Sequence, residues 1–280
     1  MKISKALFNF YIQASFYLAL SAVALTWLSF ISMDYDVDWL LLGFVFTATI
    51  TGYNFVLYAG IAKWQHRSLP QNLRWIQLFS LLTFFVMLLF LWQLPTRLWW
   101  WIVVTAILTL FYAVPVLPNG KNLRNVSGLK ILIIALVWAM VTVLFPIVFN
   151  QIPITKVELT LFFQRFLFIL ILVLPFEIRD LKNDLLSLET IPQRIGVQNT
   201  KIFGIVLLII IGVLEIWLQK HLPNPLQFTY FIIMITSVFL LFANPQRPKN
   251  YTAFWVEGIP VIWLVLEATM GQLVESHPQL

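Results

Sequence analysis

The sequence contains no cysteine and few charged residues. The absence of cysteine excludes disulfide bonds, thiolate nucleophiles and cysteine-ligated metals. Charged residues make up 11% of the chain, whereas soluble domains carry about 25%. Hydrophobic residues make up 60% of the 280 positions, and a soluble fold of that composition would have to expose a very large apolar surface. The composition therefore predicts an integral membrane protein.

Long apolar runs account for most of the chain. They have 16 to 24 residues, the length needed to cross the hydrocarbon core of a bilayer, and runs this long favour helices over barrel strands. The runs are 8–31, 39–60, 74–94, 98–116, 128–149, 157–177, 201–219, 228–243 and 252–274. We therefore expect an all-α integral membrane protein, a bundle of about nine transmembrane helices in a single domain over residues 1–280. The first run is expected to remain as a span, because no small-residue cleavage site follows it.

Basic residues are distributed unevenly between the two sides of such a bundle. With nine spans, fourteen Lys and Arg residues fall on the side of the N-terminus and four on the other side. The positive-inside rule then predicts a multi-pass protein of the cell (inner) membrane, with the N-terminus in the cytoplasm and the C-terminus outside. The basic residues are scattered over five short segments, so no nucleic-acid partner is expected. The long loops at 61–73, 117–127 and 178–200 fall on the cytoplasmic side, where we expect the site.

Carboxylates gather at the end of the sixth run. Glu177, Asp180 and Asp184 have helical spacing and would share one face, while Arg179 and Lys182 would lie on the other side. Stacked carboxylates repel each other unless a cation sits between them, and Mg²⁺ is the divalent ion that oxygen ligands and phosphates favour. The alternative is an ordinary helix terminus in which the two basic residues neutralise the acids.

The same stretch resembles a known motif. Arg179-Asp180, Asp184, Thr190-Ile191-Pro192 and Gly196 follow each other as in the second acidic motif of the UbiA superfamily of intramembrane prenyltransferases. Two further segments are similar to landmarks of that family. They are Tyr112-Ala113-Val114-Pro115 with Lys121, Arg124 and Lys130, and Arg67-Ser68-Leu69-Pro70. The resemblance covers nearly the whole chain and implies a nine-helix bundle.

The chain departs from the family at the first acidic motif. The family has Asn followed by three aspartates there, and this chain keeps Asn54 but has Phe55, Tyr58 and Ala62 at the aspartate positions. Half of the expected metal site is therefore missing. Asn54 and Tyr58, four residues apart, would present only neutral oxygens to one face.

The resemblance implies a prenyltransferase that moves an isoprenoid group from a polyprenyl diphosphate to an aromatic or other lipophilic acceptor within the lipid membrane. In that interpretation Asp180 and Asp184 hold Mg²⁺ at a weakened site with Glu177 as a third ligand, and Arg179 and Lys182 take part in catalysis. The substrate-binding residues would be Asn54, Tyr58, Arg67, Tyr112, Lys121, Arg124 and Lys130. Two alternatives stay open: a catalytically degenerate isoprenoid-binding or assembly protein of the same family, and a small-molecule transporter.

Four further ionisable residues fall inside the predicted spans, where burial is costly. They are Arg165, Glu215, Glu257 and Glu267. Glu257 precedes Gly258 and Pro260, where a kink would open the helix towards a cytoplasmic cavity. Glu267 is expected near the outer surface, within reach of water, and Arg165 is expected to extend towards the outer interface.

The charge distribution makes the orientation testable. Cysteines introduced at Ser187 and Ser276 should differ in their reaction with a membrane-impermeant thiol reagent in intact cells, because only Ser276 is expected outside. Labelling of the cysteine at position 187 from outside would reverse the predicted orientation.

Overall fold

The computed structural model describes residues 2–58, 73–115, 122–126, 128–182 and 188–276, and these form helices without a strand. In chain order the elements are α1 (Lys2–Gln13), α2 (Phe16–Ser32), α3 (Trp39–Tyr58), α5 (Leu73–Gln93), α6 (Thr96–Ala113), η2 (Leu123–Asn125), α7 (Leu129–Ala139), η3 (Met140–Leu144), α8 (Phe145–Phe149), α9 (Lys156–Asp180), α10 (Ile191–Leu218), α11 (Thr229–Phe242), η5 (Tyr251–Val256) and α12 (Ile259–Ser276). The turn η2 is a 3-10 turn, whereas η3 and η5 are π-helical.

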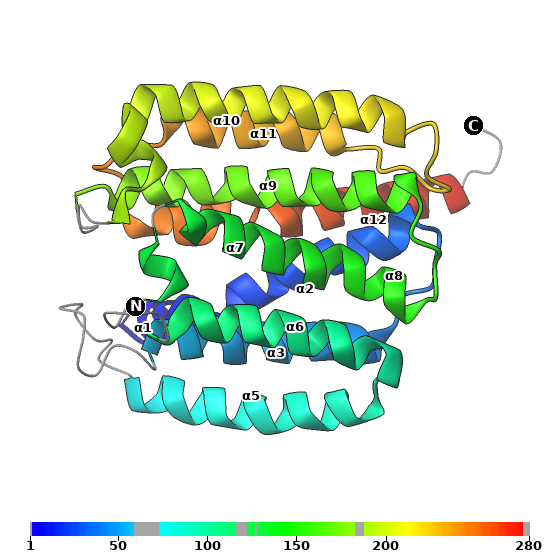
Figure 1. The fold of residues 1–280 in the computed structure, drawn as a ribbon, viewed down its shortest axis with the longest axis horizontal. Coiled ribbons are helices and arrows are strands. Elements are labelled where there is room, and N and C mark those ends of the chain that lie inside the picture. The colour runs from blue at the N-terminus through cyan, green and yellow to red at the C-terminus, as the bar shows by residue number, and fades with distance from the viewer. Residues whose placement is uncertain (1, 59–72, 116–121, 127, 183–187, 277–280) are drawn as a thin grey trace.

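The helices lie side by side along the long axis of the molecule (Figure 1). One edge of the bundle is formed by α10 and α11, and the opposite edge by α5. Between them, α9 packs against α7 and α10, while α2 packs against α3 and α12. The largest apolar core surrounds α9, which is the most buried of the long helices. In contrast, α5 buries only Ile76 and Thr83 and turns a broad apolar face outward, as expected for a helix in contact with lipid.

The helix lengths suit a membrane. Among the described residues, seven helical segments are long and apolar enough to cross one: α3, α5, α6, Leu129–Phe149, α9, α10 and Tyr251–Thr269. The helices α2 and α11 are apolar but shorter, with 17 and 14 residues. The all-helical fold is therefore confirmed, and the count of nine spans stays a prediction. The two termini lie at opposite ends of the long axis (Figure 1).

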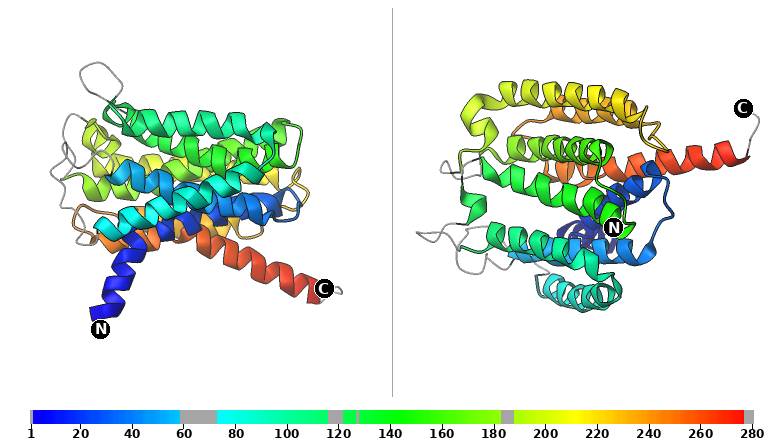
Figure 2. Two further views of the ribbon diagram at one scale, coloured as in Figure 1. Left: turned by 90° about the horizontal axis from the view of Figure 1, so that it is seen from below. Right: turned by 45° about the vertical axis from the view of Figure 1, so that its right-hand side comes forward.

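The first apolar run is not one continuous helix, which corrects the expectation for residues 8–31. The chain breaks at Ser15, whose φ of 58° is left-handed, and divides the run into α1 and α2. In a continuous helix the carbonyls of Gln13 and Ala14 would accept hydrogen bonds from N–H groups of the following turn. Here these two carbonyls accept hydrogen bonds from Tyr58 and Asn54 of α3, at 2.8 and 3.1 Å. The helix α1 consequently leaves the bundle at an angle (Figure 2).

Two other helices are interrupted near prolines. The π-helical turn η3 precedes Pro146, and η5 ends just before Glu257 and Gly258, with Pro260 two residues further on. A proline has no N–H to donate to the carbonyl four residues earlier, and a π-helical turn accommodates the lost bond. The interruption lies beside Glu257, where the sequence predicts a kink, and the kink itself stays a prediction.

The close packing at Gly258 leads to a stability prediction. A Cβ at this position would lie 2.8 Å from the Phe254 carbonyl oxygen and against the Tyr17 hydroxyl, so Gly258→Ala should lower stability by about 1–3 kcal/mol. Gly212 of α10 is the matched control, because a Cβ there would meet side chains only at 3.9 Å. Thermal unfolding in detergent measures both variants. Equal melting temperatures would contradict the packing described for Gly258.

Candidate functional site

Charged residues from several helices meet at one end of the bundle, where α3, α6 and α9 end and α5, α7 and α10 begin; we call it the basic end (Figure 1). Six of its residues form what we call the charged cluster. They are Arg124, Lys130, Glu177, Arg179, Asp180 and Glu257. Local sequence explains how the helix ends come to lie there. Pro115 follows the end of α6, left-handed Gly128 precedes α7, and Thr190 and Gln193 form a capping box at the start of α10.

Lys130 and Glu177 form a buried ion pair between α7 and α9. The Lys130 Nζ lies 2.8 Å from Glu177 Oε1, and the Glu177 side chain is only 2% exposed. A buried carboxylate needs a cation beside it, because an isolated buried charge loses its hydration without compensation. Glu177 therefore already has its counter-ion within the protein, and this counter-ion is one of the residues expected to bind substrate.

Arg179 and Asp180 form a second ion pair at the end of α9. Arg179 donates from Nε and Nη2 to the two carboxylate oxygens of Asp180, at 2.8 and 2.7 Å. Its remaining terminal nitrogen, Nη1, donates to the hydroxyl of Thr252 and, at 3.4 Å, to the carbonyl of Lys249. The expectation that Arg179 would lie on the side of the helix away from the carboxylates was therefore wrong. Because α9 ends at Asp180, the arginine side chain can fold back onto its neighbour.

Glu257 and Tyr53 connect the cluster to two more helices. Glu257, directly after η5, interacts electrostatically with Arg179, and Tyr53 of α3 interacts with Glu257, Tyr112 and Arg124. Tyr112 is 7% exposed in α6. Glu257 and Tyr112 could be selected from the sequence, whereas no sequence pattern singled out Tyr53, which precedes the family-like Asn54 by one residue.

Asn54 and Tyr58 do not face the charged cluster. Asn54 is 2% exposed, accepts a hydrogen bond from the Ser15 hydroxyl at 2.8 Å, and donates to the Ala14 carbonyl and to the Ser80 hydroxyl. Tyr58 donates to the Gln13 carbonyl. Both side chains are engaged at the break between α1 and α2, so their contacts in this structure are structural and do not join Asp180.

Three of the expected residues, Arg67, Lys121 and Asp184, lie outside the described residues. Lys182 lies in the turn after α9 and is exposed. Of the three carboxylates expected to share one helix face, the described residues include Glu177 and Asp180, both in α9, which ends at Asp180.

A magnesium site does not fit the part of the cluster that the structure describes. No group of three or more His, Asp or Glu side chains is arranged to hold a metal ion in this part of the chain. Two of the three carboxylates expected as ligands, Glu177 and Asp180, are each paired with a cation, Lys130 and Arg179 respectively. A metal ion that bound both carboxylates would compete with these cations, because ligand oxygens and a divalent ion must be in direct contact.

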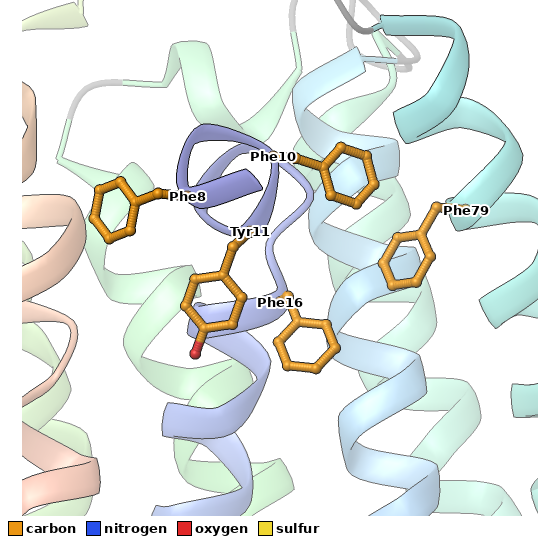
Figure 3. Close-up of a pocket in the computed structure, with 5 residues that line it drawn as sticks. All are labelled: Phe8, Phe10, Tyr11, Phe16 and Phe79. Carbon is orange, nitrogen blue, oxygen red and sulfur yellow. The ribbon is translucent and has the colours of Figure 1, made fainter. Parts of the chain in front are cut away.

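An aromatic pocket lies beside the basic end. It has a volume of about 480 Å³, lies between α1, α2 and α5, and is lined by Phe8, Phe10, Tyr11, Phe16 and Phe79 (Figure 3). From Tyr11 the aromatic contacts continue to Tyr17, at 5.5 Å between ring centroids, and then to Phe254, at 5.1 Å. Tyr17 in turn interacts electrostatically with Glu257. A row of aromatic rings thus leads from the pocket to the charged cluster.

Arg165 lies inside the bundle, which corrects the expectation that it extends to the outer interface. It is 3% exposed and donates from Nη1 to the Leu25 carbonyl of α2 at 2.8 Å. Its guanidinium carbon lies 5.9 Å from the centre of the Trp263 ring. The arginine joins α9, α2 and α12 through contacts that need no carboxylate.

Glu215 and Glu267 are also buried and bonded. Glu215 accepts hydrogen bonds from Gln164 and Gln219, at 2.7 and 2.8 Å. Glu267 accepts from the backbone N–H of Gln227 and of Phe228, immediately before α11, so it ties α12 to the start of α11 and is not the acid in contact with water that was expected. Neither residue belongs to the charged cluster.

Comparisons with protein-family models, with curated proteins and with solved structures find no match for this chain. Three cations and three acids lie at the end of an apolar bundle, beside an aromatic pocket. Such an arrangement suits a ligand with an anionic head and an apolar tail.

The contacts of Asn54 make its structural role testable. Asn54→Ala removes hydrogen bonds to Ser15, Ala14 and Ser80, and should lower the stability of the protein in detergent by about 1–3 kcal/mol because buried polar groups lose their partner. Asn199→Ala is the control, since Asn199 is exposed and bonds only to the Ile195 carbonyl. Melting temperatures that match in the two variants would remove the role assigned to Asn54.

Proposed function

We propose that this protein is an intramembrane prenyltransferase of the UbiA type, which moves an isoprenoid group from a polyprenyl diphosphate to a lipophilic acceptor. The observation that carries the proposal is the combination of Arg124, Lys130 and Arg179 at the basic end with the aromatic pocket beside them. The resemblance of the segments around Arg179 and Tyr112 to the family motifs supports it further. The proposal places the basic end in the cytoplasm, in the cell membrane.

The diphosphate and the prenyl group of the substrate need different surroundings, and the site has cations for the first and aromatic rings for the second. When the bond between the first prenyl carbon and the diphosphate oxygen breaks, the electron pair leaves with the diphosphate and the prenyl carbon becomes cationic. Guanidinium and ammonium groups stabilise the negative charge that develops on the leaving group. Aromatic rings stabilise the prenyl cation and surround the apolar tail. A nucleophilic atom of the acceptor then bonds to the prenyl carbon and releases a proton.

Within this proposal the cations of the protein carry the electrostatic work. Arg179 presents a planar guanidinium, which matches two phosphate oxygens at once, and Lys130 adds a compact charge from the first turn of α7. Arg124 lies on η2, between α6 and α7. Glu177 and Asp180 are each paired with a cation, so in this proposal the cations of the protein, and not magnesium, meet the charge of the leaving group.

A second candidate is a catalytically degenerate isoprenoid-binding protein of the same type. The observation that favours it is the neutralisation of Glu177 and Asp180, the two described carboxylates at the end of α9, by Lys130 and Arg179. Such a protein would hold the diphosphate and its tail without breaking the bond between them.

Diphosphate release distinguishes the two candidates. The purified protein is incubated with labelled geranylgeranyl diphosphate and a lipid extract as the source of acceptors. A prenyltransferase releases diphosphate, and Arg124→Gln should reduce the rate at least about tenfold, because it removes a charge that faces the leaving group. Arg97→Gln is the control, since Arg97 bonds the carbonyls of Val148 and Phe149 near the opposite end of the bundle. Binding without any diphosphate release would assign the chain to the second candidate, and absence of binding would reject both.

A further inference from the structure

The guanidinium of Arg179 is bonded on two edges, to neutral groups on one edge and to a carboxylate on the other. Its Nη1 is fixed by the Thr252 hydroxyl and the Lys249 carbonyl, both from the segment that leads into α12. Its other edge, formed by Nε and Nη2, meets the two oxygens of Asp180. This edge is the one that binds a carboxylate or a phosphate through two parallel hydrogen bonds. The guanidinium therefore keeps its orientation through Thr252 even if Asp180 moves away.

The bond to Asp180 is the easier of the two ion pairs to break. The Asp180 side chain is 27% exposed and lies on the last residue of α9, so it can turn into water. Adjacent residues on a helix do not face each other, and the helix gives such a pair little support. Partly exposed ion pairs also contribute little to stability. Glu177 differs, because it is 2% exposed and would remain buried without a partner if Lys130 left it.

We infer that Asp180 is a releasable counter-ion that occupies the phosphate-binding edge of Arg179 and leaves it when a lipid-linked diphosphate arrives. The inference rests on the proposed function, because it specifies how the diphosphate binds at the same site. Asp180 turns towards solvent, the diphosphate takes its place on Nε and Nη2, and Thr252 keeps the guanidinium in position. Lys130 stays with Glu177 and adds its charge from the side. Asp180 is then a competitor of the diphosphate and not a ligand of magnesium.

The two roles of Asp180 predict opposite effects of the same substitution. If Asp180 were a metal ligand, its loss would weaken diphosphate binding. If it is a competing counter-ion, Asp180→Asn removes the competitor and binding becomes tighter. Since the gain is limited to the strength of a partly exposed ion pair, it should be about two- to fivefold.

The experiment measures the affinity of purified protein for geranylgeranyl diphosphate in detergent, with EDTA and with Mg²⁺. With EDTA the parent should bind, Asp180→Asn should bind about two- to fivefold more tightly, and Arg179→Lys should bind about tenfold more weakly because the planar edge is lost. Glu189→Gln is the matched control. It removes an exposed carboxylate near the start of α10 that pairs with Arg194 and not with Arg179, and it should leave the affinity unchanged.

Three other outcomes would overturn either the inference or the proposed function. Binding that requires Mg²⁺ and is lost in Asp180→Asn would make Asp180 a metal ligand and overturn the inference, while the proposed function would stand. An equal gain in Glu189→Gln would show a general charge effect and would also overturn it. No binding of geranylgeranyl diphosphate by the parent under either condition would reject the proposed function itself. Asp180→Ser removes the same charge and is measured by the same criteria if Asp180→Asn lowers the melting temperature.

Discussion

The requirement that every polar group inside a bilayer finds its partner within the protein organises this structure. A bilayer core contains no water to satisfy such groups. Arg165 bonds a backbone carbonyl of α2, Glu267 bonds the N–H groups at the start of α11, and Asn54 bonds both sides of the break between α1 and α2. These contacts tie α9 to α2, α12 to the start of α11, and α3 to the break between α1 and α2. The buried polar residues thus fix which helices are neighbours, and apolar packing fills the space between them.

The same requirement shapes the basic end. Glu177 and Asp180 each have a cation beside them, and they differ in how deeply they are buried. The ion pair of Glu177 with Lys130 is shielded from solvent on the Glu177 side and forms part of the contact between α7 and α9. The pair of Asp180 is open to solvent and belongs to a helix end, where a side chain has room to move. A ligand with an anionic head therefore meets one fixed pair and one pair that can exchange partners.

Two interruptions in the helices place the aromatic pocket next to the charged cluster. The break at Ser15 lets aromatic residues of α1 line the aromatic pocket together with Phe16 and Phe79, and the π-helical turn η5 places Glu257, the next residue, beside Arg179. An uninterrupted helix could not do either, because its side chains follow a fixed rotation of about 100° per residue. The aromatic pocket and the charged cluster are therefore neighbours as a result of irregular backbone at two places.

The sequence alone determined the class of the protein, the position of most of its helices and one segment of the charged cluster, at the end of α9. Bilayer thickness fixes the length of an apolar run, and proline and capping residues mark the ends of α6, α9 and α10. Only the tertiary structure decided what each polar residue does. Tyr53 and Asn54 are adjacent, yet one faces the cluster and the other faces the break before α2. Likewise, spacing alone could not show that Lys130 reaches Glu177, because an ion pair between α7 and α9 depends on how those helices pack.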